Sequence, residues 1–319
     1  MEDGIEARTM RTRRHAWYSL APILILLGSS GSAFGQEAGG TLIWSMQPEK
    51  RAYCPGEPVA LTVRITNTSG RAESVDFGMD GIEAFSFELR NDANECVASG
   101  GKIIRPGLAR VGMLNVGPGE TTEKSIVLNQ WCSTLLPPGV YAITCTVEYW
   151  LVSDATVEPG SGNALMMGST RKTEFGATIE LVACDDAKRR EILVALAERA
   201  EQEPTSRPEL LARMFAQELL VFAEWEAAVP YQADLLITAN IGSWLRQDAI
   251  QSLVKSETLE ATNALMTVVR RRGSFEDVYR HAIAGVYTLR DTSKPEILSA
   301  TEAFVAEHER PPAIPLPTD

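Results

Sequence analysis

The residues with the most versatile chemistry in this 319-residue chain are three histidines and five cysteines. His15 lies in the N-terminal segment, whereas His281 and His308 fall in stretches of helical periodicity, away from any distinctive serine or cysteine. A hydrolytic triad needs a base beside its nucleophile, and the sequence contains no Gly-x-Ser-x-Gly motif. We therefore expect no catalytic residues and no enzyme activity. A hydrolase with an unrecognised site is the alternative.

Metal and cofactor chemistry is not indicated either. Zinc sites use clustered cysteines, histidines or carboxylates, and the chain has no Cys-x-x-Cys or His-x-x-x-His pair. Asp76, Asp80 and Glu83 are close in sequence, but their spacing does not match a calcium-binding loop. The sequence also lacks the glycine-rich motifs of phosphate and dinucleotide sites. We therefore predict neither a metal site nor a cofactor.

Residues 1–35 have the layout of a secretory signal peptide. Four arginines between residues 8 and 14 precede an apolar run at 16–27, and small residues follow. The run is 12 residues long, whereas a membrane-spanning helix needs about 20. The pattern predicts cleavage between Gly35 and Gln36 and export to the periplasm or the exterior, with no membrane span afterwards. A retained anchor is the alternative.

Charge and composition exclude other classes of protein. Apolar residues make up 45% of the chain and charged residues 23%, which excludes a disordered chain and a multi-span membrane protein. The net charge of −12 argues against nucleic acid as a partner, because nucleic-acid binding depends on clustered Lys and Arg. The length favours about two domains.

The first half of the mature chain, residues 36–184, alternates with a period of two. Val59, Leu61, Val63 and Ile65 share one face of a strand, and residues 141–149 repeat the pattern. Turn dipeptides such as Pro-Gly separate seven to nine short strands. These features predict an antiparallel, immunoglobulin-like β-sandwich. The Gly-Val-Tyr triplet ending at Tyr141 fits a tyrosine corner.

Several stretches of this half resemble the immunoglobulin-like domain of the BsuPI-type proteinase inhibitor family. The resemblance covers most of residues 42–150. Its motifs are Gly56-Glu57-Pro58-Val59, Asn67-Thr68-Ser69, Phe85-Ser86-Phe87-Glu88-Leu89, Pro118-Gly119-Glu120-Thr121 and Pro138-Gly139-Val140-Tyr141. It implies a sandwich fold and a peptidase inhibitor that acts through sandwich loops. An insertion at residues 152–171 and the extra cysteines depart from the family pattern.

The cysteines predict one disulfide and one buried thiol. Five remain after cleavage, so at least one is free or intermolecular. Cys54 and Cys132 fall in two connections at the same end of an immunoglobulin-like sandwich, so we expect them to form a disulfide in an oxidising compartment. Cys145 lies on the inward face of its strand and is expected to be a buried free thiol. The sequence does not place Cys96 or Cys184.

The second half, residues 185–310, changes to a helical period. We expect seven helices, at 186–203, 207–225, 229–240, 244–255, 257–272, 275–288 and 294–308. Similar residues recur 33 positions apart, as in Arg213–Ala216 and Arg246–Ala249. This region resembles HEAT repeats, which implies an α-solenoid. An irregular helical bundle is the alternative.

A long connection in the first half carries the predicted partner site. Leu165, Met166 and Met167 lie within it between polar, glycine-rich flanks, and exposed methionines suit adaptable contacts. Packing of this loop on the helical half is the alternative. A Pro-rich tail follows at 311–319. We therefore expect an exported protein of two domains, the first all-β and the second all-α. We expect it to bind a protein partner as a scaffold or adaptor.

Overall fold

Secondary structure changes from strands to helices within one unit formed by residues 34–319. The computed structural model describes residues 41–77, 81–103, 113–152, 168–238, 241–270, 276–292 and 294–308. The predicted signal peptide and the Pro-rich tail lie outside these described residues. The last strand ends at Leu181 and the first helix begins at Asp186, so the change falls at the predicted position near Cys184.

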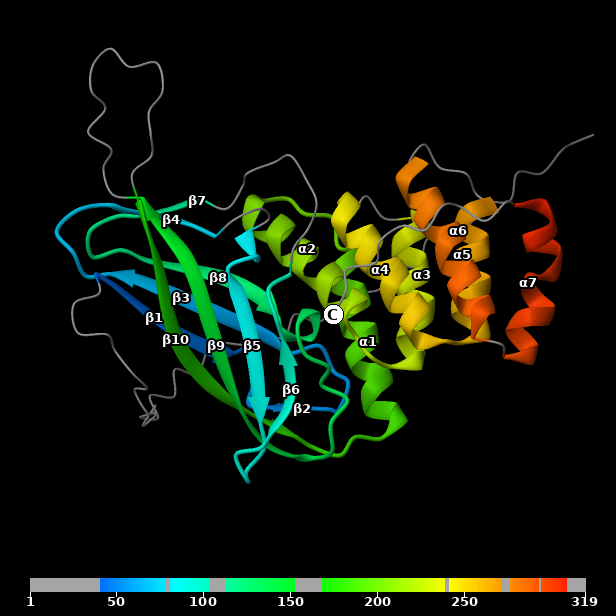
Figure 1. The fold of residues 1–319 in the computed structure, drawn as a ribbon, viewed down its shortest axis with the longest axis horizontal. Coiled ribbons are helices and arrows are strands. Elements are labelled where there is room, and N and C mark those ends of the chain that lie inside the picture. Colours follow the sequence, from blue (N-terminus) through cyan, green and yellow to red (C-terminus); the bar gives the residue numbers. More distant parts are fainter. Residues whose placement is uncertain are drawn as a thin grey trace, which may run out of the picture. The chain divides into compact units, whose positions relative to one another are not determined.

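Ten strands form in the described part of the first half (Figure 1). They are β1 (Leu42–Pro48), β2 (Ala52–Tyr53), β3 (Ala60–Asn67), β4 (Glu73–Asp76), β5 (Phe85–Arg90), β6 (Cys96–Gly100), β7 (Met113–Val116), β8 (Thr121–Val127), β9 (Gly139–Val152) and β10 (Gly168–Leu181). Buried and exposed side chains alternate along β1, and buried and half-buried ones along β5. The period-two reading of this half is therefore confirmed.

These strands form two sheets. One is antiparallel, in the order β1-β3-β8, and the other has the order β2-β10-β9-β4-β7. Strands β9 and β10 pair along their whole length, from Gly139 opposite Leu181 to Val152 opposite Gly168. The opposite edge of β9 pairs with β5 and then with β4. The short β2 pairs parallel with the end of β10, whereas the other pairings between described strands are antiparallel.

Inward side chains of both sheets meet in one hydrophobic core. Trp44 of β1 stacks on Phe175 of β10 with ring centroids 5.8 Å apart, and it contacts Tyr149 of β9 at 5.0 Å. Ile65 of β3 and Ile143 of β9 are buried in the same core. Burial of these side chains is the main free-energy gain of this half.

Tyr141 forms the expected corner at the start of β9. Its hydroxyl donates a 2.8 Å hydrogen bond to the carbonyl oxygen of Pro137. We expect Tyr141→Phe to lower the free energy of unfolding by about 1 kcal/mol, the usual net value of one such hydrogen bond. Urea unfolding measures the change. Tyr231→Phe is the matched control, because the Tyr231 hydroxyl has no hydrogen-bond partner among the described residues. Equal losses in both variants would contradict the assignment.

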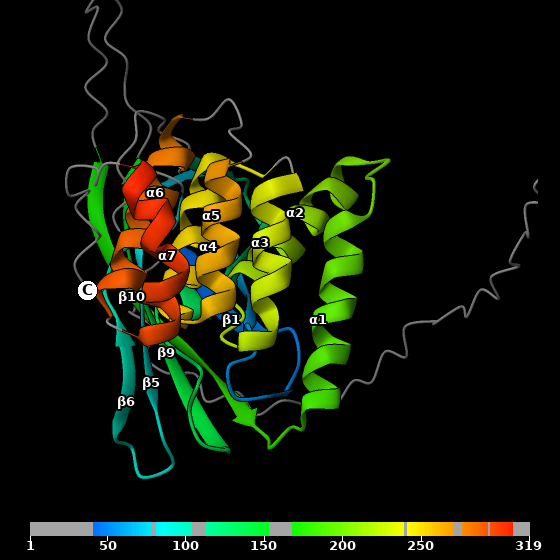
Figure 2. The ribbon, with the colours of Figure 1, turned by 90° about the vertical axis from the view of Figure 1, so that its right-hand side faces the viewer.

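Seven helices follow in the described second half, as predicted (Figure 2). They are α1 (Asp186–Glu201), α2 (Arg207–Val221), α3 (Val229–Thr238), α4 (Ser243–Ser256), α5 (Leu259–Arg270), α6 (Glu276–Asp291) and α7 (Pro295–Glu307). Asp185 caps α1 by accepting a 2.8 Å hydrogen bond from the backbone N–H of Lys188. Proline occupies the first turn of α2 and of α7, where its missing N–H costs nothing.

Helix α2 ends four residues earlier than its apolar pattern suggests. The side-chain amide of Gln232 on α3 donates to the carbonyl oxygens of Leu220, Val221 and Ala223. The bonds to Leu220 and Val221 satisfy carbonyls in the last turn of α2, which have no partner inside the helix, and the third bond satisfies the carbonyl of Ala223 just beyond it. A short 3-10 turn, Glu226–Ala228, then leads into α3.

Consecutive helices lie side by side in pairs, α1 with α2, α3 with α4 and α5 with α6, and α7 follows on α5 and α6 (Figure 2). Their buried side chains form a second core, which also contains Cys54, Ala60 and Val127 from the β-rich region. Within the described residues, none of the helices is both long and apolar enough to cross a membrane.

Candidate functional site

A disulfide joins the two halves of the chain, but its pairing differs from the predicted one. Cys54 bonds to Cys184, with their Cα atoms 5.6 Å apart. The predicted bond between Cys54 and Cys132 is wrong, because Cys132 is a free, buried thiol whose sulfur lies 3.6 Å from the carbonyl oxygen of Phe87. The reason is the parallel pairing of β2 with β10. It sets Tyr53 opposite Leu181 and so brings Cys54 beside the segment that enters α1.

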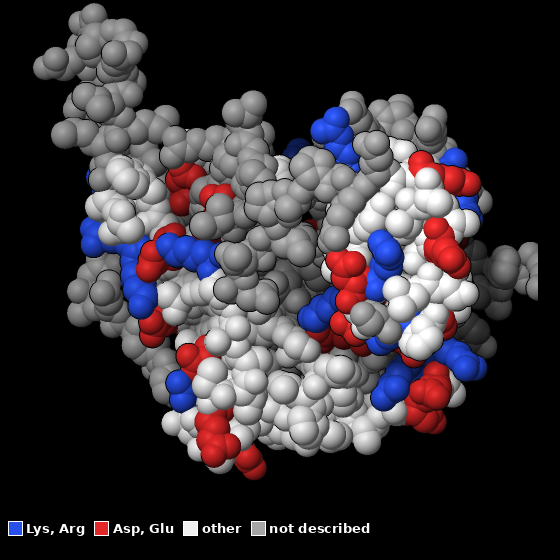
Figure 3. Space-filling view, turned by 45° about the vertical axis from the view of Figure 1, so that its right-hand side comes forward, with Lys and Arg blue, Asp and Glu red and all other residues white. Residues whose placement is uncertain are grey.

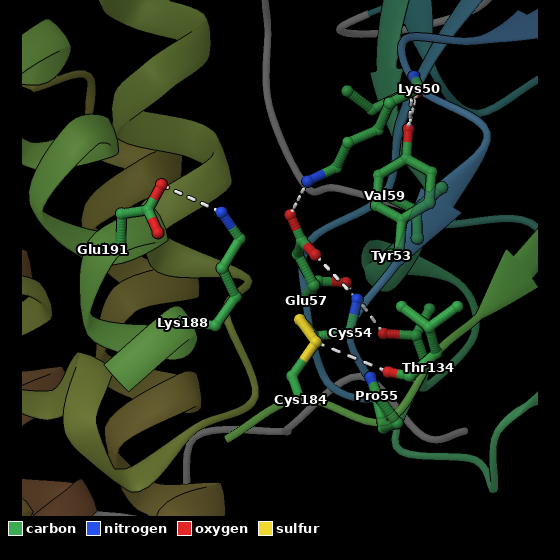
Figure 4. Close-up of polar contacts among 12 residues, drawn as sticks. Lys50, Tyr53, Cys54, Pro55, Glu57, Val59, Thr134, Cys184, Lys188 and Glu191 are labelled. Atoms are coloured by element: carbon green, nitrogen blue, oxygen red, sulfur yellow. Dashed lines mark hydrogen bonds and ion pairs between the residues drawn. A yellow bond between two sulfur atoms is a disulfide. The ribbon is translucent and has the colours of Figure 1, made fainter. Parts of the chain in front are cut away.

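A buried carboxylate supports the turn that follows this disulfide (Figure 4). Glu57 accepts a 2.7 Å hydrogen bond from the backbone N–H of Cys54 and forms an ion pair with Lys50. The Lys50 ammonium also lies 4.9 Å from the centre of the Tyr53 ring. Together these contacts fix the Cys54 side of the connection between the two halves.

Residues between α2 and α3 dock onto the same turn. The Glu224 carboxylate accepts a 2.7 Å hydrogen bond from the backbone N–H of Thr134 and a 3.3 Å bond from the Asn129 amide. The indole N–H of Trp225 donates to the carbonyl oxygen of Pro55 at 2.7 Å. Because these partners are mostly buried and hydrogen-bonded, the helices that follow are held firmly against the β-rich region.

Gly56 is required at this contact. Its φ of +80° favours glycine, and an added Cβ would lie 2.8 Å from the indole nitrogen of Trp225. The close approach allows the Trp225 ring to cover the turn next to Cys54. The disulfide, the two carboxylates and this contact are one structural joint, which we call the Cys54 joint.

A groove lies on the helical region. The groove lies between α1, α2 and α3 and has a volume of about 280 Å³. Its lining residues are Ala197, Ala200, Glu201, Glu203, Arg213, Gln217, Leu220, Tyr231, Asp234 and Leu235. Apolar side chains form part of its walls, and charged side chains of both signs line it. We call this feature the α1–α3 groove.

Several charged groups of the groove are available to a ligand. Arg213 is half-buried, and its Nε atom is buried without a hydrogen-bond partner. Neither Glu201 nor Glu203 forms an ion pair with it, and both are exposed and unpaired among the described residues. An unsatisfied buried donor costs free energy and is a recognised feature of functional sites. The described lining carries carboxylates, a guanidinium group and a phenol hydroxyl.

The structure does not describe the predicted partner residues. Leu165, Met166 and Met167 belong to the connection between β9 and β10 and fall outside the described residues. Among the described residues, no three His, Cys, Asp or Glu side chains are grouped so that they could hold a metal ion.

The free thiols differ in accessibility. Burial raises the pKa of the Cys145 thiol and raises that of Cys132 to about 12, whereas Cys96 is exposed. The predicted buried thiol at Cys145 is therefore confirmed. We expect iodoacetamide at pH 8 to modify one thiol per native chain, at Cys96, and three after unfolding without reductant. Peptide mass spectrometry measures the modified sites. Fast modification of Cys132 or Cys145 in the native chain would contradict the structure.

The charges on the visible face are intermixed by sign. Figure 3 shows Lys and Arg side chains next to Asp and Glu side chains, with uncharged surface between them. Nucleic acids bind to surfaces where basic side chains gather, whereas the described residues on this face carry basic and acidic side chains next to one another.

Comparisons with known proteins give no family for the chain. No protein-family model matches it, and no curated protein matches it significantly. Among solved structures, Bacillus subtilis Spo0M, described as a sporulation control protein, is 15% identical with a TM-score of 0.25, covering 50% of this chain and 54% of its own. A PapD-like domain of human CEP192 is 11% identical with a TM-score of 0.20, covering 44% of this chain and 87% of its own.

An Escherichia coli alpha-2-macroglobulin is 9% identical with a TM-score of 0.22, and the match covers 84% of this chain but 24% of the macroglobulin chain. The chain thus spans about half the length of Spo0M and about a quarter of the macroglobulin. At these TM-scores the likenesses support no inference about fold or function.

Proposed function

We propose that this chain is an exported, non-catalytic adaptor that binds a segment of a partner protein in the α1–α3 groove. The observation that carries the proposal is the set of unpaired charges in the groove, with Arg213 as the half-buried cation. Binding sites typically combine apolar walls with a few polar groups. The Cys54 joint supports the proposal, because a rigid surface loses little entropy when a partner binds.

The architecture in this proposal is an immunoglobulin-like sandwich followed by a HEAT-like helical array. The shared core of the two sheets and the Tyr141 corner support the sandwich. The pairwise packing of consecutive helices supports a repeat array. Such arrays present extended binding surfaces, which suits an adaptor.

Export to an oxidising compartment is the second part of the proposal. The Cys54–Cys184 disulfide supports it, because structural disulfides persist in secreted and periplasmic proteins. We expect the mature protein to begin at Gln36 or within a few residues of it. Mass spectrometry of the mature N-terminus tests this part, and a mature chain that retains residues 16–27 would contradict it.

The groove is tested by partner capture with matched variants. The chain and its Arg213→Gln variant are each used as bait in extract from the compartment that holds the protein. Arg190→Gln is the control, because Arg190 is an exposed arginine on α1 that has no ion-pair partner among the described residues and does not line the groove. We expect one partner to be retained by the wild-type and control baits and lost with Arg213→Gln. Equal retention by all three baits would exclude the groove as the contact surface.

A second function, peptidase inhibition, is favoured by the segment after Cys132. The Leu135 side chain is 63% exposed, the largest value among the exposed large hydrophobic residues of the described chain. Its neighbour Thr134 is fully buried, and the Thr134 carbonyl oxygen accepts a hydrogen bond from Gly56. An exposed apolar residue on a backbone fixed in this way could enter the specificity pocket of a peptidase without losing much entropy.

Inhibition is tested directly with serine peptidases that prefer apolar side chains. If the segment is inhibitory, the purified chain slows these peptidases at micromolar concentration, and Leu135→Asp removes the effect. Val140→Asp is the control, because Val140 is similarly exposed but lies beyond the fixed segment. No inhibition by the wild-type chain, or equal inhibition by Leu135→Asp, would exclude this second function.

A further inference from the structure

We infer that the α1–α3 groove recognises a dipolar peptide segment, in which an acidic side chain binds Arg213 and a nearby basic side chain binds Glu201 and Glu203. This inference rests on the proposed function and names the ligand class of the same groove. It follows from which charges line the groove and which of them have no partner.

Arg213 provides the contact for the acidic side chain. It is half-buried, and the described part of the chain supplies neither a hydrogen bond nor an ion pair to its guanidinium group. A guanidinium group presents several donors in a planar fork that matches a carboxylate. A ligand carboxylate would therefore pair with the part of the Arg213 guanidinium group that lines the groove.

Glu201 and Glu203 provide the contact for the basic side chain. They lie at and just beyond the end of α1 and line the same groove, and their carboxylates form no ion pair or hydrogen bond with another described residue. A carboxylate-rich groove with a single unpaired arginine would repel a purely anionic ligand. A ligand that carries both charges can pair with both parts of the lining.

The walls and the volume favour a short stretch of chain. Ala197, Ala200, Leu220 and Leu235 are apolar lining residues, and they lower the local dielectric constant, so charge pairs inside are stronger than in water. The volume of about 280 Å³ lies near the lower end of the range of roughly 300–1,000 Å³ for small-ligand cavities. It is sufficient for a few side chains and too small for a folded element.

An apolar strip on α2 favours a segment of a longer chain over a free amino acid. Leu210 is three residues before Arg213 and one helical turn before Met214, so it is a neighbour of both on the helix surface, and Leu210 and Met214 are both exposed. A peptide that places its acidic side chain on Arg213 can continue over this strip. Adjacent exposed apolar surface is typical of protein-binding sites.

Selection from a peptide library tests the inference. The library consists of random hexapeptides with an acetylated N-terminus and an amidated C-terminus, so that only side chains carry charge. We expect the wild-type chain to enrich peptides with one acidic and one basic residue within three positions. Arg213→Gln should lose the preference for the acidic residue and bind the selected peptides about 10- to 100-fold more weakly, as expected when a hydrogen bond to a charged group is lost.

A second variant tests the inference even if Arg213→Gln does not fold. Glu201 and Glu203 are exposed, so the double variant Glu201→Gln/Glu203→Gln should fold normally. It should lose the preference for the basic residue while keeping the acidic one. Arg190→Gln is again the control and should select the same peptides as the wild-type chain.

The outcomes separate this inference from the proposed function. Selection without a paired-charge preference, or an unchanged preference in Arg213→Gln, overturns the dipolar ligand. If partner capture is still lost with Arg213→Gln, the groove function stands and only the ligand class is wrong. Free zwitterionic dipeptides that compete as strongly as the selected hexapeptides would overturn the assignment to a peptide segment.

Discussion

Replacing Cys54 and Cys184 together by serine should lower the free energy of unfolding by about 4–5 kcal/mol. The bond links residues 130 positions apart, with a Cα–Cα distance of 5.6 Å that is typical of disulfides. In the chain-entropy treatment, a longer closed loop gives a larger stabilisation. Guanidinium chloride unfolding, followed by circular dichroism, measures the loss.

The control for this prediction is Cys96→Ser, which removes an exposed free thiol. It should leave the unfolding midpoint within experimental error. Addition of reductant should destabilise the wild-type chain and leave the double serine variant unchanged. A double variant as stable as the wild-type chain would contradict the assigned pairing.

Trp225→Ala should cost about 3–5 kcal/mol, the usual range for truncation of a large buried aromatic side chain. The side chain is 7% exposed, and its indole N–H is bonded to the carbonyl oxygen of Pro55. The substitution removes packing from the Cys54 joint and leaves the Pro55 carbonyl oxygen without this partner. The expected result is a lower melting temperature together with faster hydrogen exchange near residues 54–57.

Trp150→Ala is the matched control for Trp225→Ala. The Trp150 side chain is 42% exposed on the outer face of β9, so its truncation should cost less than about 1 kcal/mol. Thermal unfolding of both variants compares the two sites. Similar losses of unfolding free energy in the two variants would show that Trp225 does not stabilise the Cys54 joint.

Local periodicity predicted most of the secondary structure. All seven helices lie close to their expected positions, because each apolar stripe and each cap is encoded within a few residues. Asp185, for example, caps α1 as expected from its place before the apolar stripe. The Tyr141 corner could also be predicted, because the hydroxyl of Tyr141 bonds to Pro137, only four residues away in sequence.

The disulfide pairing could not be predicted in this way. It depends on β2, a two-residue strand that pairs parallel with the end of β10. So short a strand has no periodic signal, and its partner lies more than 120 residues away in sequence. The prediction instead assumed that Cys54 and Cys132 share one end of a sandwich, and the observed β2–β10 pairing overrides that assumption.

The α1–α3 groove also could not be predicted from the sequence. In one dimension, Arg213 is an ordinary arginine on an amphipathic helix, which most often points to solvent. Its half-buried position depends on how α1 and α3 lie against α2. The spacing along α2 carries the signal that was missed. Arg213 is three residues before Ala216 and four before Gln217, which are both buried, so Arg213 borders the buried face of the helix.

Hydrogen exchange of the captured complex tests the central claim most directly. The chain is compared with and without its partner, and exchange is followed by mass spectrometry of peptic peptides. The adaptor proposal predicts slower exchange on binding in peptides from α1, α2 and α3, which line the groove, and the same protection in Arg190→Gln. Protection confined to peptides that contain Leu135, with no change in these three helices, would contradict it.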